Sequence, residues 1–428
     1  MQLPAKLSRL REGIGLELLI GLSLKMAGAV TSFGLNLLIS RQLGAEGVGI
    51  FQIALTTAAF AAVGATLGLD TMLVRSVSVS WRKNARSNAN AATRKVLRIV
   101  ASTGLISGVL VALGSIPVTL WVMEEPQMLM PLLIMSCSVP FLAIIRVLSS
   151  AIRGTGNVLT SQSLDGVSYT GLAAIAFSLA ILLANPQTDL LPIICYVGAT
   201  LLVALVGWRS LKRLFCGLDG GSTELKLLSG RSIAIMVLLV QFIDWAAIFM
   251  LGATSGLAEA GIYRIAAQYC LLFTLINNSF AQMAGPHLAN MYAESDFRGM
   301  LITATRVGFA GFAVGLPLFI GILVFPEYLM LLFGEQFGIG AQALVILAAG
   351  RFVSVCVGPM GTLLIMARRE NITLGLEILS ASSAALLLFL LVPLMSLTGA
   401  AIAVLSAALL RNVGSLVAAW TILGRMKA

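Results

Sequence analysis

Residues 49–54 read Gly-Ile-Phe-Gln-Ile-Ala and residues 261–266 read Gly-Ile-Tyr-Arg-Ile-Ala, so one short motif occurs twice. The two copies lie 261 − 49 = 212 positions apart in a chain of 428 residues. The polar residues that follow repeat at the same offset: Gln52, Thr56, Thr66 and Asp70 after the first copy, Arg264, Gln268, Asn278 and Gln282 after the second. On a helix these intervals return to nearly one angular position, so each copy predicts a helix with a single polar stripe.

Long apolar runs surround both motifs. Only 11% of the chain is charged and 58% is hydrophobic, with a mean hydropathy of +0.98, which leaves too little polar surface for a water-soluble globule. Runs of about 18 or more apolar residues indicate membrane spans. They lie near residues 14–40, 48–70, 99–122, 128–150, 167–184, 190–208, 232–254, 262–286, 303–324, 341–366, 372–394 and 398–422. Because hydrocarbon offers backbone amides no partners, we predict an all-α membrane protein of about twelve transmembrane helices, not a β-barrel.

The offset divides these spans into two lobes, residues 1–208 and 232–428, joined by a cytoplasmic linker at residues 209–231. Each lobe has an even number of spans, so both enter the membrane in the same direction and form a parallel repeat. We expect the stripes, together with Asn36 on the first span, to line a central cavity between the lobes. The alternative is that polar stripes only join helices to one another, as hydrogen-bonding side chains in membranes often do.

The formal net charge of +10 is explained by the way the chain is oriented in the membrane, with its basic loops on one side. If the N-terminus is cytoplasmic, most basic residues fall in the inner loops, while the outer loops hold mainly acids such as Glu124, Glu125 and Glu327. This is the positive-inside rule, and it predicts that both termini are cytoplasmic. The basic excess therefore indicates contact with anionic membrane lipids and gives no reason to expect a nucleic acid partner.

A few charges remain at membrane depth: Lys25, Asp244, Arg351 and Arg411, with Arg264 just inside the outer boundary. Each costs roughly 2.5–3.5 kcal/mol at a helix centre, so together they must face water, one another or a ligand. Structural explanations stay open for each. Lys25 could extend to an interface, Arg264 could mark the outer rim, Arg351 could pair with Asp244, and Arg411 could have a structural partner or a lipid headgroup.

The excess of bases over acids in this set favours an anionic cargo. Lysine and arginine form charge-assisted hydrogen bonds to phosphate, so we predict that Lys25 and Arg264, with Arg351 or Arg411, bind a pyrophosphate. A buried carboxylate beside bases can change protonation during a transport cycle. Asp244 is therefore a candidate for coupling to H⁺ or Na⁺, and Asp70, near an inner helix end, is a second.

The sequence lacks the motifs of enzymes and metalloproteins. There is no G-x-x-x-x-G-K-[ST] loop, the five cysteines show no metal-binding spacing, and His287 is the only histidine. The expected outer loops are too short for a catalytic domain, which a membrane glycosyltransferase or polymerase would need. We expect a transporter without cofactor or metal, and not an enzyme.

Two stretches resemble a known family. Residues 40–51, Ser-Arg-Gln-Leu-Gly-Ala-Glu-Gly-Val-Gly-Ile-Phe, and residues 153–157, Arg-Gly-Thr-Gly-Asn, the latter echoed by residues 368–371, are similar to the Wzx-type polysaccharide flippases. These belong to the multidrug/oligosaccharidyl-lipid/polysaccharide exporter (MOP) superfamily. The resemblance extends over the whole chain in length, span number and repeat. It implies a multi-pass protein of the bacterial inner membrane that works by alternating access.

The resemblance also implies a cargo. Wzx-type flippases, which serve the synthesis of O-antigen and other surface polysaccharides, move undecaprenyl-pyrophosphate-linked oligosaccharides to the periplasmic leaflet, and other polysaccharide-assembly proteins are possible partners. The related lipid II flippase holds pyrophosphate with bases on its first and eighth helices, where this chain has Lys25 and Arg264. The alternative is a cation-coupled multidrug antiporter of the same superfamily. That branch usually has an acid on the first helix, where Lys25 stands here.

Overall fold

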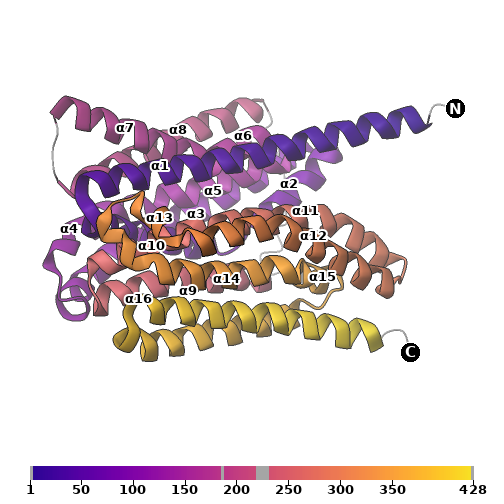
Figure 1. The fold of residues 1–428 in the computed structure, drawn as a ribbon. Helices are drawn as coiled ribbons and strands as arrows, with labels where there is room; N and C mark the ends of the chain where they lie inside the picture. Colours follow the sequence, from indigo (N-terminus) through magenta and orange to yellow (C-terminus); the bar gives the residue numbers. More distant parts are fainter. Residues whose placement is uncertain (1–2, 185–187, 218–230, 426–428) are drawn as a thin grey trace. The chain divides into compact units, whose positions relative to one another are not determined.

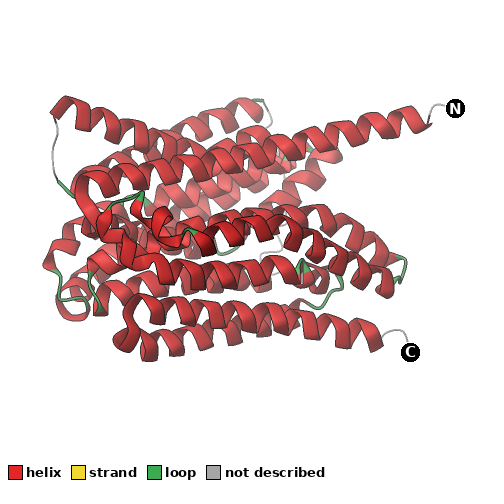
Figure 2. Ribbon diagram, in the orientation of Figure 1, coloured by secondary structure: helices red, strands yellow, loops and turns green. Residues whose placement is uncertain are grey.

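The computed structural model describes residues 3–184, 188–217 and 231–425, and within these ranges every regular element is a helix (Figure 2). The first half of the chain forms the helices α1 (Leu3–Thr66), α2 (Leu69–Arg82), α3 (Arg86–Pro117), η1 (Val118–Val122), η2 (Pro126–Met128), α4 (Leu129–Ser136), α5 (Val139–Gly154), α6 (Val158–Gln162), η3 (Ser163–Val167), α7 (Ser168–Ala184) and α8 (Leu190–Leu214).

The second half contains α9 (Arg231–Thr254), α10 (Leu257–Tyr269), α11 (Leu271–Ala293), α12 (Phe297–Val324), α13 (Pro326–Leu331), η4 (Glu335–Gly340), α14 (Ala341–Val357), α15 (Met360–Met366) and α16 (Glu370–Arg425) (Figure 1). The predicted all-α fold is thus confirmed for the residues described.

The number of membrane crossings also agrees with the sequence. Nine stretches of the described chain are long and apolar enough to cross a membrane. Two of them, Ser23–Thr66 and Glu370–Ile422, contain 44 and 53 residues, enough for two crossings each, and they bend at Gly44 and Ser396. A further crossing, α10 and α11, is interrupted at Cys270. These account for the roughly twelve spans expected. The side of the membrane on which the termini lie stays a prediction.

The internal repeat is visible in the backbone. Gly44 and Gly256 both have positive φ, 71° and 107°, and 256 − 44 = 212. Such a conformation favours glycine because any Cβ is strained there. The fourth and tenth spans match at both ends: α4 begins at Leu129 and α14 at Ala341, while α5 ends at Gly154 and α15 at Met366, again 212 positions apart.

The chain packs as two compact units. The first comprises Met1–Leu38, Thr57–Pro117 and Gln127–Arg231, and in it α5 is central, packing against α2, α3 and α8. The second comprises Ile39–Thr56, Val118–Pro126 and Ser232–Ala428, and in it α14 is central, packing against α10, α12 and α16. In each unit the central helix thus belongs to the fourth span of a repeat. The expected division at residues 209–231 stays a prediction, because residues 218–230 lie outside the described chain.

Candidate functional site

The two motif copies meet each other inside the second unit. A Cβ on Gly49 would collide with the backbone oxygen of Leu257, and one on Gly261 with that of Ala45. Glycine at both positions lets the two helices cross with their backbones in contact, as small residues do in membrane helix pairs. Residue and counterpart face one another here, which is the pattern of a two-fold contact.

The first polar residues of the two stripes are directly bonded. Arg264 Nε donates a hydrogen bond of 3.0 Å to Oε1 of Gln52, its partner in the repeat 212 positions away. Gln52 is only 1% exposed and Gln268 is also buried. Thr56 donates to the backbone oxygen of Gln52 in its own helix. This part of the stripe therefore joins helices, which is the alternative left open by the sequence.

The remaining members of the second stripe are in a different environment. Asn278 and Gln282, both on α11, have exposed side chains. On the first span Asn36 is buried. The stripe thus changes along its length from packed to accessible, and only its accessible end can contact a ligand without repacking. Whether these residues line a cavity between the lobes stays a prediction.

Asp244 and Arg351 form the pair that the sequence suggested. Arg351 Nη2 donates to Oδ1 of Asp244 at 3.1 Å, joining α9 to α14. The Asp244 side chain is 41% exposed, so this pair is accessible as well as bonded. Such a pair lowers the cost of placing either charge inside a membrane.

Arg411 also has a carboxylate partner. Its Nη1 lies 3.9 Å from Oε2 of Glu377, both on α16. Glu377 is 10% exposed, and its Oε2 accepts no hydrogen bond from any described residue. The expectation that Asp244 is the only acid deep in the membrane is therefore wrong, because Glu377 lies within the eleventh span and is largely buried.

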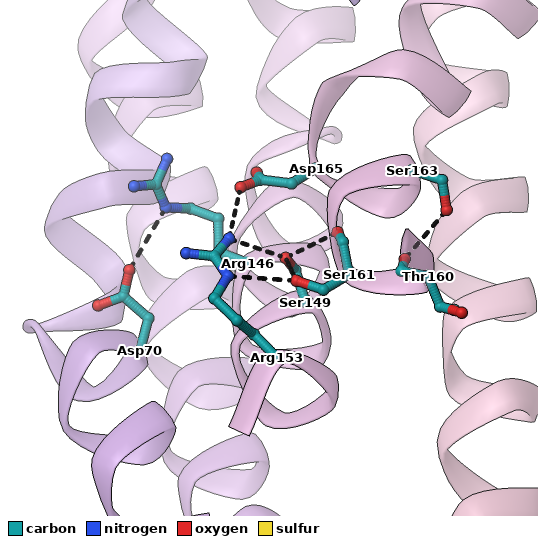
Figure 3. A network of polar contacts seen from close by, with 8 residues as sticks. All are labelled: Asp70, Arg146, Ser149, Arg153, Thr160, Ser161, Ser163 and Asp165. Carbon is teal, nitrogen blue, oxygen red and sulfur yellow. Dashed lines mark hydrogen bonds and ion pairs between the residues drawn. The ribbon is translucent and has the colours of Figure 1, made fainter. Parts of the chain in front are cut away.

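The first unit contains a second polar cluster, drawn in Figure 3. Arg153, near the end of α5, lies 3.3 Å from Asp165 and donates to the hydroxyls of Ser161 and Ser149. Asp165 and Gly166 interrupt the fifth span, since neither has helical backbone angles. Broken membrane helices commonly position binding residues because they expose backbone polar groups. Asp165 was not among the residues expected from the sequence, although the offset of 377 − 165 = 212 pairs it with Glu377.

Arg146 and Asp70 extend this cluster. Arg146 Nε lies 3.7 Å from Asp70 Oδ2, beyond hydrogen-bond distance, so the contact is an ion pair only (Figure 3). A cavity of about 60 Å³, enough for a few water molecules, lies beside it. The cavity is lined by Ala59, Ala62, Leu142, Ile145, Arg146, Asp165, Tyr169 and Tyr196.

Lys25 belongs to the same region of the first unit. It lies on α1, half-buried, where it interacts electrostatically with Arg153 and Asp165. Six residues further along α1, Thr31 Oγ1 lies 3.0 Å from Thr170 Oγ1, so α1 packs against α7 just beyond the break in the fifth span. The structure therefore brings Lys25 together with Arg153 and Asp165, the ion pair at the break in the fifth span.

Several solved transporter structures have a fold similar to that of this chain. The chain is similar to an inward-facing multidrug resistance MATE family transporter of the MOP superfamily, with a TM-score of 0.76, 14% identity and coverage of 96% of this chain and 99% of that one. An outward-facing transporter of the same description gives a TM-score of 0.66 at 14% identity, covering 96% of each chain.

A MOP superfamily transporter from Pyrococcus furiosus, described as having a binding pocket of reverse polarity, gives 0.67 at 14% identity and covers 96% of this chain and 95% of that one. At such identities the likeness concerns the fold. No curated protein sequence matches the chain.

A family model described as polysaccharide biosynthesis protein matches residues 14–291, which is more than half of the chain. This match and the shared transporter fold agree with the resemblance found in the sequence. The chain is a multi-pass membrane protein with a MOP superfamily transporter fold, and it belongs to the polysaccharide biosynthesis protein family.

Proposed function

We propose that the protein is a lipid-linked oligosaccharide flippase. It moves an undecaprenyl-pyrophosphate-linked glycan from the cytoplasmic to the periplasmic leaflet of a bacterial inner membrane by alternating access. The family description supports a role in polysaccharide synthesis, and the excess of bases over acids at membrane depth supports a phosphate-bearing cargo.

The observation that carries this proposal is the cluster around Lys25. Lys25 interacts with Arg153 and Asp165, and Arg146 and Asp70 lie next in the same cluster. Among the described side chains, three bases therefore accompany two acids. The cluster is accessible, since both side chains of the Arg153–Asp165 pair are exposed. A pyrophosphate oxygen can bind there without breaking a buried ion pair.

We propose that the bases of the second unit bind the pyrophosphate later in the transport cycle than Lys25 does. Arg264 is held by Gln52, Arg351 by Asp244 and Arg411 by Glu377. A phosphate that reaches them competes with a bonded partner. We therefore assign first contact with the pyrophosphate to Lys25 and keep Arg264, Arg351 and Arg411 as ligands of a subsequent state.

Ion coupling is assigned to Asp244, with Asp70 as the second candidate. A proton or Na⁺ that binds Asp244 neutralises the carboxylate that holds Arg351, and so frees that guanidinium for phosphate. Asp244→Asn should leave transport insensitive to an imposed H⁺ or Na⁺ gradient. An unchanged gradient response would assign the coupling to another group.

The test is transport by the purified protein in proteoliposomes that carry an undecaprenyl-pyrophosphate oligosaccharide. Lys25→Ala should reduce the rate about tenfold or more, the loss expected for one charge-assisted hydrogen bond. Lys25→Arg should keep most of it. Lys83→Ala is the matched control, because Lys83 is an exposed base outside the cluster. Full activity of Lys25→Ala would overturn the assignment of the phosphate site.

The same liposomes distinguish the antiporter alternative. A flippase should leave cationic dyes inside the vesicles and should translocate the sugar-lipid. Ion-driven dye efflux that the sugar-lipid does not inhibit would identify a multidrug antiporter instead.

A further inference from the structure

A groove lies on the surface of the second unit, away from the polar residues discussed above. It has a volume of about 570 Å³ and is lined by Ile302, Thr305, Arg306, Phe309, Ala310 and Trp420. All but Trp420 come from α12, where the spacing of three and four residues places them on one face. The groove thus runs along α12, beside the end of α16.

This face of α12 is its free face. The opposite face packs closely against α14, where a Cβ on Gly308 would meet the backbone oxygen of Cys356 at 2.6 Å. On the groove side Phe309 is 72% exposed and Trp420 is 52% exposed. Phe309 and Phe312 stack with ring centroids 6.2 Å apart, which extends the aromatic surface along the helix. In a membrane span, such a surface is in contact with acyl chains.

Arg306 is the unusual residue of this groove. It lies near the start of the span expected at residues 303–324, on the helix Phe297–Val324, and its side chain is exposed. In the described part of the chain no carboxylate lies within ion-pair distance of it, whereas Arg351 and Arg411 each have one. A cation near the end of a membrane span, without a protein partner, needs water or an anion from the bilayer.

Trp420 indicates the depth of the site. Tryptophan is enriched where headgroups meet acyl chains, because one end of the indole is apolar and its N–H is polar. Arg306 and Trp420 line the same groove, so the guanidinium has headgroup-level surroundings while Ile302 and Phe309 offer apolar contact. This combination matches a phosphate joined to an acyl chain.

We infer that this groove is a binding site for an anionic phospholipid of the surrounding bilayer. The lipid phosphate binds Arg306 and one acyl chain lies along Phe309 and Ile302 against Trp420. The groove contains no acid, so its charge favours a lipid of net negative charge over a zwitterionic one. Its exposure along α12 gives bulk lipid direct access. The inference does not depend on the identity of the transported cargo.

The experiment is quenching of tryptophan fluorescence by lipids with brominated acyl chains, in nanodiscs that hold the full chain. The chain has five tryptophans, so the signal of Trp420 is taken as the difference between the parent and Trp420→Phe. Brominated phosphatidylglycerol should quench Trp420 with an apparent affinity about fivefold higher than brominated phosphatidylethanolamine, as one basic contact predicts. Arg306→Gln should bring the two lipids to equal quenching.

Arg298→Gln is the matched control, because Arg298 is a second arginine on α12 that does not line the groove. It should keep the fivefold preference. Equal quenching by both lipids in the parent protein would overturn the inference, and this comparison needs no variant. So would equal loss of preference in Arg298→Gln, or quenching by a brominated polyprenyl phosphate alone, which would assign the groove to the carried lipid.

Discussion

The acids Asp165 and Glu377 occupy equivalent positions in the two repeats, yet their surroundings differ. Asp165 lies at a break in a helix, 43% exposed, and its partner Arg153 is equally exposed. Glu377 lies inside α16, largely buried, with Arg411 as its ion-pair partner. A repeat can therefore keep a carboxylate in place while its burial changes. The exposed Asp165 can exchange Arg153 for another partner, whereas the buried Glu377 compensates the charge of Arg411 inside the protein.

The largest effect is expected where the two motif copies cross. Gly261→Leu forces a side chain into the backbone at Ala45 and Gly49, which cannot move aside as a side chain could. We expect a loss of about 3 kcal/mol or more in the free energy of unfolding, measured by thermal unfolding in detergent. Gly375→Leu is the control, because a Cβ at Gly375 meets open space. Equal stability of both variants would show that the helices can separate at this point without cost.

The second largest effect is expected at the buried acid, Glu377. Glu377→Gln leaves the Arg411 guanidinium without a charged partner, and breaking a buried ion pair costs about 3 kcal/mol. The double variant Glu377→Gln/Arg411→Gln should recover part of this loss, because no uncompensated charge remains. Thermal unfolding of the parent, the single variants Glu377→Gln and Arg411→Gln, and the double variant gives the coupling energy. Purely additive losses would contradict the view that the pair acts as a unit.

The smallest effect on stability is expected at the exposed copy. Asp165→Asn should change the free energy of unfolding by less than about 1 kcal/mol, because accessible ion pairs contribute little. Transport of sugar-lipid should nevertheless fall, since Asp165 orients Arg153 beside Lys25. Unfolding and transport are measured on the same preparation. A destabilisation as large as that of Glu377→Gln would remove the distinction between the two copies.

Part of the site was readable from the sequence. The offset of 212 identified Gln52 and Arg264 as equivalent positions, although the sequence predicted that they line a cavity and not that they bond to each other. Residue depth identified Asp244 and Arg351 as possible partners. The same offset applied to acids would have found Asp165 and Glu377. The offset could not have shown that Gln52 is buried and Asn278 exposed, because both are polar residues of the same repeated pattern.

The membrane spans and the repeat follow from the sequence alone. Apolar runs must become helices because lipid offers backbone amides no partners, and the offset between motifs follows from counting. Which charges pair, which polar groups are buried and where the fifth span breaks became known from the three-dimensional structure. Those outcomes depend on how closely helices approach and how each is rotated, and this is set by packing between residues far apart in the chain, such as Gly49 and Gly261.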